Sequence, residues 1–154
     1  MRIAKIATVL TGIALLAAAQ SATIDVGDDR LVTIAGLDAP VVEPHLSINP
    51  KDPNHIIASA MVARPDHTYG VIGLSSRDGG RTWDSHDFDR RQGGDVWTAF
   101  LPDGTALLSF LAGTDAELQV FRSSDGGRTW SEKPATVARG QDHGTLLVAP
   151  DGSL

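Results

Sequence analysis

The sequence has no cysteine, few aromatic side chains and fewer basic than acidic residues. Cysteine is absent from all 154 positions, which excludes disulfides and a lipid-modified N-terminal cysteine. The 13 basic residues against 19 acidic ones give a net charge of −6, and we find no lysine or arginine cluster. Nucleic acids and anionic lipid surfaces both need basic patches, so we expect neither as a partner. A hydrophobic content of 42% is ordinary for a globular protein.

The first 19 residues have the layout of a secretory signal peptide. Arg2 and Lys5 precede an uncharged, mostly apolar run over residues 6–19, and Ala17-Ala18-Ala19 offers a small-residue cleavage site. About 14 apolar residues are fewer than the roughly 20 that a membrane-spanning helix needs, which favours a cleaved signal over an anchor. The sequence therefore predicts a secreted or periplasmic protein without membrane association after signal cleavage.

One octet occurs twice, and it is the strongest pattern in the chain. Residues 76–83 read SRDGGRTW and residues 123–130 read SSDGGRTW, so seven of eight positions are identical at a spacing of 47 residues. The flanking sequence repeats more loosely, with β-prone runs before the octets at 69–75 and 118–122. Repeats of about 40–50 residues are typical of propeller blades.

Each repeat predicts four antiparallel strands joined by turns that are rich in Asp and Gly. No segment after residue 22 has a sustained helical apolar period, whereas short β-prone runs alternate with turn signals such as Pro102-Asp103-Gly104. We therefore expect an all-β fold of the β-propeller kind. Further expected strands lie at 46–48, 56–62, 96–101, 105–111 and 145–149.

The chain contains only about two and a fraction of such units. We expect one blade over 44–90, a second over 95–139 and a truncated third over 142–154, together a partial propeller at 44–154. Residues 20–43 form an N-terminal segment with a candidate closing strand at 31–34. Because rings need about 4–8 blades, we expect missing C-terminal blades in a longer protein.

The side chains of the octet suit the tip of a hairpin. The aspartate can accept hydrogen bonds from turn amides, the glycines permit positive φ, and the indole can cover the turn. The threonine and tryptophan then start the next strand. These roles are structural, and neither aspartate is expected to act in acid/base catalysis. The residues concerned are Ser76, Asp78, Gly80, Thr82, Trp83, Ser123, Asp125, Gly127, Thr129 and Trp130.

This octet resembles the Asp-box, or BNR repeat, of the sialidase/neuraminidase superfamily. The resemblance covers about residues 40–152 and implies a sialidase-like propeller, of six blades in the full protein. It also implies that the Asp-boxes lie on the rim away from the active site, and that the partner is a glycan or glycoconjugate. The same box occurs in non-catalytic secreted propellers and in other glycoside hydrolases.

Catalytic roles follow from that resemblance at two positions. Sialidases grip the carboxylate of sialic acid with arginines, and they use a Tyr/Glu nucleophile with an Asp acid/base. By position before the first octet, Arg64 resembles such an arginine and Asp66 resembles the acid/base. However, Val42 stands where the arginine of the family's Arg-Ile-Pro motif belongs when Pro44 is set on its proline. The remaining groups would lie in later blades, so we expect the present chain alone to be inactive.

Three acidic residues are candidates for ligand contact. Asp95 and Asp142 lie 47 residues apart, and each opens an expected inner strand, as Glu43 does in the first blade. The ends of such strands would face the central channel of a propeller, and strand capping is the alternative role. No metal or cofactor is expected, because the five histidines lack ligand spacing and EF-hand spacing is missing from Asp84, Asp87 and Asp89.

Three functions remain open at this point. Our first expectation is a secreted sialidase-like glycoside hydrolase of the exo-alpha-sialidase type, which acts on terminal sugars of glycans. The alternative is a non-catalytic Asp-box propeller that serves as a carbohydrate- or protein-binding module. A glycosidase or lyase of another specificity is the third. Fold does not fix function, so the deciding residues are the arginines and the Tyr/Glu pair expected in later blades.

Overall fold

The computed structural model describes residues 24, 26–29, 31–32, 34, 37–88 and 92–154. The predicted signal peptide over 1–19 lies outside these residues. The described members of the candidate closing strand, residues 31, 32 and 34, belong to no sheet, because no described strand pairs with them. Within the part of the chain that is described, we find no helix with the length and apolarity needed to cross a membrane.

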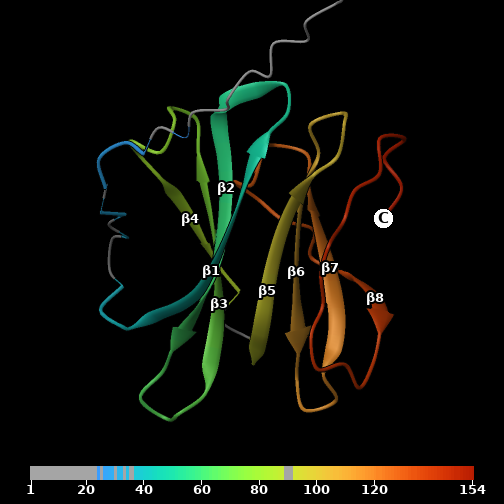
Figure 1. The fold of residues 1–154 in the computed structure, drawn as a ribbon. Coiled ribbons are helices and arrows are strands. Elements are labelled where there is room, and N and C mark those ends of the chain that lie inside the picture. Colours follow the sequence, from blue (N-terminus) through green and yellow to red (C-terminus); the bar gives the residue numbers. More distant parts are fainter. Residues whose placement is uncertain (1–23, 25, 30, 33, 35–36, 89–91) are drawn as a thin grey trace, which may run out of the picture.

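Eight strands form two four-stranded antiparallel sheets, and no described residue is helical (Figure 1). The predicted all-β class is thereby confirmed. The strands follow one another in chain order within each sheet, so every connection is a hairpin. The first sheet contains β1 (Val41–Asn49), β2 (Asp52–Ala63), β3 (Tyr69–Ser76) and β4 (Asp84–Asp87). The second contains β5 (Gly93–Phe100), β6 (Ala106–Ala112), β7 (Glu117–Ser123) and β8 (Ala135–Ala138).

The two sheets are built on the same register. Ile56 pairs with Ser76 in the first sheet, and Ala106 pairs with Ser123 in the second, so each octet starts at the same point of its ladder. The first strand of each sheet carries a bulge near its start, between Val42 and His45 in β1 and between Gly94 and Trp97 in β5. The internal repeat of the sequence is therefore also a repeat of strand pairing.

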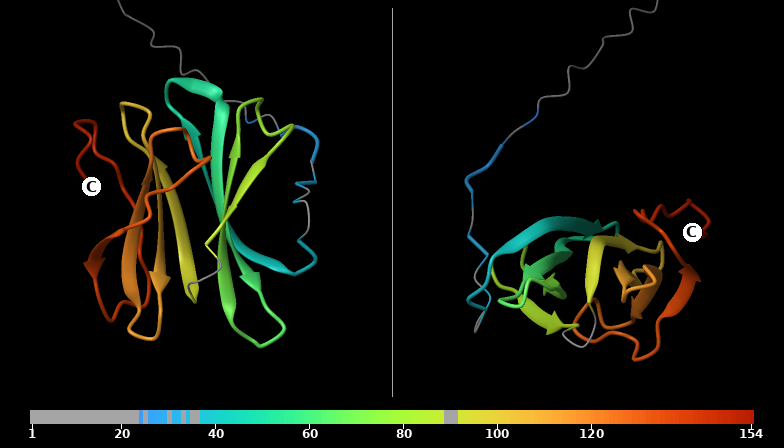
Figure 2. Two further views of the ribbon diagram at one scale, coloured as in Figure 1. Left: turned by 180° about the vertical axis from the view of Figure 1, so that it is seen from behind. Right: turned by 90° about the horizontal axis from the view of Figure 1, so that it is seen from below.

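The main core lies between the sheets, which stand side by side (Figure 2). The facing surfaces of the two sheets bury a group of aromatic side chains. Phe110 and Phe121 stack with their ring centroids 5.2 Å apart, and Phe88, which directly follows β4, meets them edge-on. Burial of such rings contributes about 1.5–3 kcal/mol each, so this core fixes the position of one sheet against the other.

The expected strand at 145–149 is not formed. Residues 143–149 run beside the outer face of the second sheet, where Leu146 is buried against Leu107 and Val120. A strand needs a ladder partner, and none of the described strands pairs with this segment. In this structure the apolar side chains of the segment therefore pack on the second sheet, and the segment itself is in no sheet.

Candidate functional site

The hairpin between β3 and β4 carries the first octet, which folds around the carboxylate of Asp78. Its Oδ1 accepts hydrogen bonds from the backbone amides of Arg81 and Thr82, both at 2.9 Å, and its Oδ2 accepts one from the Thr82 hydroxyl at 2.7 Å. The Ser76 hydroxyl donates to Oδ1 at 2.9 Å and accepts the Gly80 N–H at 2.9 Å. These bonds, those from Thr82 above all, favour the ionised form and hold the pKa of Asp78 well below its usual range.

The hairpin between β7 and β8 repeats this arrangement around Asp125. Thr129 donates its amide at 2.9 Å and its hydroxyl at 2.6 Å, while Ser123 donates at 2.8 Å and accepts the Gly127 N–H at 2.7 Å. Burial alone would raise the pKa of Asp125, but the bonds from Thr129 and Ser123 outweigh it and lower the pKa to about 2. Both turns need left-handed backbone, with φ between 72° and 92° at Gly79, Gly80, Gly126 and Gly127.

The two octet tryptophans have different surroundings. Trp83 is half-buried and donates its indole N–H to the Gly80 carbonyl at 3.1 Å, so it covers its own turn. Trp130 is only 8% exposed, because it lies in the core between the sheets beside Phe88. A side chain at Gly73 would approach the indole nitrogen of Trp130 to 3.3 Å, which shows how closely this ring packs on β3.

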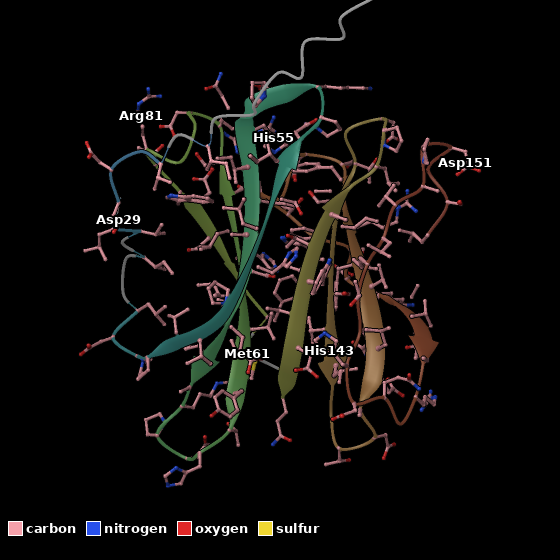
Figure 3. The ribbon with its side chains drawn as sticks, viewed as in Figure 1. Asp29, His55, Met61, Arg81, His143 and Asp151 are labelled. Atoms are coloured by element: carbon pink, nitrogen blue, oxygen red, sulfur yellow. The ribbon has the colours of Figure 1, made fainter. Side chains whose placement is uncertain are left out.

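Side chains of the first sheet hold the second octet in place. The His55 ring bonds the Gly126 carbonyl through Nε2 at 2.9 Å, and the Arg77 guanidinium donates to the Asp125 carbonyl at 2.8 Å. Figure 3 shows His55 near the end of the sheets where the first octet lies, marked by Arg81. Arg77 occupies the one octet position that differs between the two copies, where the second copy has Ser124. The two hairpin tips are therefore joined to each other.

The loop after β2 and the loop after β6 lie at the opposite end of the sheets from the octets (Figure 1). An open polar groove lies between these loops. It has two adjoining parts of about 330 Å³ and 570 Å³, which share Gln92 and Gly113. The smaller part lies between the sheets, and Tyr69 forms part of its wall. The polar groups of the larger part are amides, a hydroxyl and carboxylates, contributed by Gln92, Thr114, Asp115, Glu117 and Gln119.

The floor of the larger part is a fixed polar network. The buried Gln119 side chain donates to Glu117 at 2.9 Å, and Arg139 forms an ion pair with the other carboxylate oxygen of Glu117. Gly113 donates its amide to the Gln92 carbonyl at 2.8 Å, which ties the β6–β7 loop to the start of β5. Groups held in this way meet a ligand without reorganising, which lowers the entropic cost of binding.

The predicted catalytic pair comes from the loop that borders the groove. Asp66 is fully exposed, and its Oδ1 accepts the amide and the hydroxyl of Thr68 at 3.1 Å and 2.7 Å. The Thr68 hydroxyl, then its amide, lower the pKa of Asp66 below its usual value. Arg64 closes the loop by donating its backbone amide to the Thr68 carbonyl, and its guanidinium lies against Gly70. Neither Arg64 nor Asp66 lines the groove itself.

Two of the three predicted ligand carboxylates lie on the first strand of a sheet, and the third follows β8. Glu43 and Asp95 both sit at the bulges of β1 and β5, with left-handed φ values of 52° and 50°. The Asp95 carboxylate lies 4.0 Å from the His143 ring, while Asp142 is exposed in the segment after β8. Bulges re-aim side chains and increase twist, so β1 and β5 turn their acidic residues in the same way.

The sequence did not point to the groove. Its polar residues follow no motif, and the only signal was a polar break between the apolar runs of β6 and β7. The metal alternatives gain no support within the described part of the chain, where no three histidine or acidic side chains gather closely enough to hold an ion. Asp89, one of the three calcium candidates, lies outside the described residues.

The comparisons with known proteins give no relationship. No protein-family model matches the chain, and neither a curated protein nor a solved structure matches it significantly. The octets, the groove and the strand geometry are therefore the features from which a function can be inferred.

Proposed function

We propose that the chain is part of an exported Asp-box β-propeller that binds the terminal sugars of glycans at the end of its sheets opposite the Asp-boxes. The observation that carries this proposal is the pair of octets. Both form the same hydrogen-bonded hairpin tip, at the same ladder position, on two neighbouring four-stranded sheets. Radial repetition of four-stranded sheets is the arrangement of a propeller, in which one end collects the ligand-binding loops.

Residues at equivalent positions of the two sheets are buried to different extents, which supports a further blade next to the first sheet. Phe100 in β5 is 8% exposed because the first sheet covers it, while Ile48, its equivalent in β1, is 55% exposed. Leu46 in β1 and its equivalent Thr98 in β5 show the same contrast, because Leu46 is 52% exposed and Thr98 is 1% exposed. In a propeller a further sheet would cover the outer face of the first sheet and remove the contrast.

The chemistry of the groove supports a sugar ligand. Sugars present hydroxyl groups and small apolar faces, which amides, carboxylates and aromatic rings recognise. The groove supplies Gln92, Gln119 and Glu117 for the hydroxyls and Tyr69 for a ring face. Its open, polar shape is poorly suited to a buried apolar ligand.

Two observations favour binding without hydrolysis. A general acid at neutral pH needs a raised pKa, whereas Thr68 lowers that of Asp66 and keeps its carboxylate ionised. Val42 also stands where the resemblance to sialidases expects an arginine. Sialidase-like hydrolysis is the second candidate, because Arg64 and Asp66 belong to the loop that forms one wall of the groove.

Binding is tested on the exported protein with an array of terminal mono- and disaccharides, followed by calorimetric titration of the best ligand. We expect Gln92→Ala and Thr114→Ala to weaken binding about fivefold or more, since each removes hydrogen bonds worth about 1 kcal/mol or more. The matched control is Ser124→Ala, an exposed position in the second octet, which should bind normally. Equal losses in the control, or no binding to any sugar, would contradict the proposal.

Hydrolysis and export are tested separately. Release of the fluorophore from a fluorogenic sialoside would establish the second candidate, and activity that survives Asp66→Ala unchanged would remove this residue from the acid/base role. N-terminal sequencing of the exported protein should begin after residue 19. A retained Met1 would show that the predicted signal peptide is not cleaved.

A further inference from the structure

Two histidines of the first sheet accept hydrogen bonds at the contact between the two sheets, which we call the seam. The backbone N–H of Thr98 in β5 donates to Nδ1 of His45 in β1 at 3.0 Å, and the Thr98 hydroxyl lies 2.9 Å from the same nitrogen. A backbone N–H can only donate, so this nitrogen carries no proton. His45 also stacks on Trp97 with ring centroids 4.0 Å apart.

A series of hydrogen bonds fixes the tautomer of His55 in β2. The Asn49 Oδ1 atom accepts the Lys51 N–H at 2.9 Å, so the amide nitrogen of Asn49 faces Nδ1 of His55, 2.8 Å away. Nδ1 therefore accepts, and Nε2 donates its proton to the Gly126 carbonyl in the second sheet at 2.9 Å. The ring is 1% exposed and meets Phe100 edge-on.

Protonation is incompatible with the arrangement at His45. An imidazolium has two donors and no acceptor, so a second proton on this ring would place a donor against the Thr98 amide. It would also place a charge in the packed contact between the sheets. The strand ladders use backbone groups and are unaffected. We propose that the seam is an acid-sensitive latch, which holds the two sheets together when His45 is neutral and opens when it is protonated.

Charged groups also lie at the seam. The guanidinium of Arg77 lies beside Gly126, next to the His55 ring. The Asp125 carboxylate accepts hydrogen bonds from the hydroxyl groups of Thr129 and Ser123.

Three more titratable groups lie on β4, on β5 and on the segment after β8. His86 on β4 has its pKa lowered by burial, although the nearby Asp87 and Asp125 raise it. Beyond Trp97 lie His143 and Asp95.

The direction of the pH effect follows from His45. Burial lowers its folded pKa below the unfolded value, so its contribution to the seam is complete above the unfolded pKa. The contribution is lost as the pH falls from about 6.5 toward the folded pKa. Opening is therefore expected in mildly acidic solution, and it does not depend on whether the groove binds glycans.

The experiment uses the absence of cysteine from the chain. Ser75→Cys places a single thiol on the buried face of β3 next to Gly127, and Ser85→Cys places one on the exposed part of β4. Labelling rates with a dithiodipyridine, which reacts in acid, are measured from pH 8 to pH 5. The ratio of the labelling rate at the buried thiol to that at the exposed thiol should rise about tenfold or more, which corresponds to a loss of about 1.4 kcal/mol in the contact between the sheets. Ser59→Cys, buried on β2, repeats the measurement if Ser75→Cys does not fold.

Histidine variants identify the groups that respond. His45→Asn keeps an oxygen acceptor near the position of Nδ1, but its side chain does not titrate. This variant should show a ratio that no longer changes with pH, while His67→Asn, on the exposed loop after β2, should respond as the unmodified chain does. The proposal is overturned by a flat ratio in the unmodified chain or by a full response in His45→Asn. Loss of the far-UV circular dichroism signal together with the labelling would also overturn it, because that would be global unfolding.

Discussion

A single carboxylate organises each hairpin tip. Asp125 collects two bonds from Thr129 and one from Ser123, and the serine in turn holds the Gly127 amide. Bonds to a charged acceptor are worth about 1.5–3 kcal/mol each, which exceeds the net value of a neutral bond. The octet therefore stabilises a turn that glycine-rich sequence would otherwise leave disordered.

We predict that Asp125→Asn destabilises the chain by about 1–3 kcal/mol. The amide keeps the shape of the carboxylate, but its nitrogen must face one of the donors of Thr129 or Ser123, and the charge is lost. Urea denaturation measures the change. The control is Asp103→Asn, in the turn between β5 and β6, whose carboxylate accepts the Thr105 amide at 2.8 Å and should cost less. Equal costs would contradict a special role for the octet aspartate.

The same carboxylate predicts a pH dependence in acid. The folded pKa of Asp125 is about 2, below the unfolded value near 3.9, so its contribution is present above about pH 4 and is lost as the pH falls toward 2. The shift at Asp78 has the same direction. In Asp125→Asn the unfolding free energy should fall less steeply between pH 4 and pH 2 than in the unmodified chain. Identical slopes would show that this carboxylate is not responsible.

At the scale of elements, the two hairpins share a sequence but not an environment. Trp130→Ala should cost about 3–5 kcal/mol, because it leaves a cavity among Phe88, Phe110 and Phe121. Trp83→Ala should cost clearly less, because this ring is half-buried at the outer face of the first sheet. Guanidinium denaturation of the two variants measures the difference. A cost for Trp83→Ala as large as that for Trp130→Ala would mean that the outer face is covered in solution.

Those tryptophans also mark how far the sequence could be used to predict the structure. The octets predicted two equivalent turns, because a turn depends on local glycine, serine and aspartate chemistry. The all-β class followed from the short β-prone runs. The unequal burial of Trp83 and Trp130 could not be predicted, because it depends on which sheet face meets a neighbour. For the same reason, the expected strand at 145–149 proved to be a segment packed on a sheet without a partner.

The candidate site was less predictable than the fold. Arg64 and Asp66 were chosen by resemblance, and they lie in a loop beside the groove without lining it. Gln92 and Gln119 are far apart in the sequence, and only the pairing of β5 with β6 and of β6 with β7 brings them to one surface. A groove formed in this way has no motif, because its residues share a position in space and not a spacing.

At the scale of the whole molecule, residues at equivalent positions of the two repeats differ in solvent exposure. Phe100 is covered by the first sheet, whereas Ile48 occupies the same position on the outer face of the first sheet and is 55% exposed. Val41 and Leu46 are also exposed on β1, and an apolar hollow of about 230 Å³ lies over this face. Such a surface is typical of an interaction site in a soluble protein.

The pair Ile48 and Phe100 gives a test of the propeller proposal. In the 154-residue chain, Ile48→Asp should change the unfolding free energy by no more than about 0.5 kcal/mol, because an exposed site loses little packing. Phe100→Asp should prevent stable folding, because it buries an unpaired charge in the core between the sheets. Ile48→Asp should also reduce the binding of an apolar fluorescent dye to the outer face. If Ile48→Asp instead disrupted folding as Phe100→Asp does, the outer face would already be covered in solution, and the chain would not be an open segment of a ring.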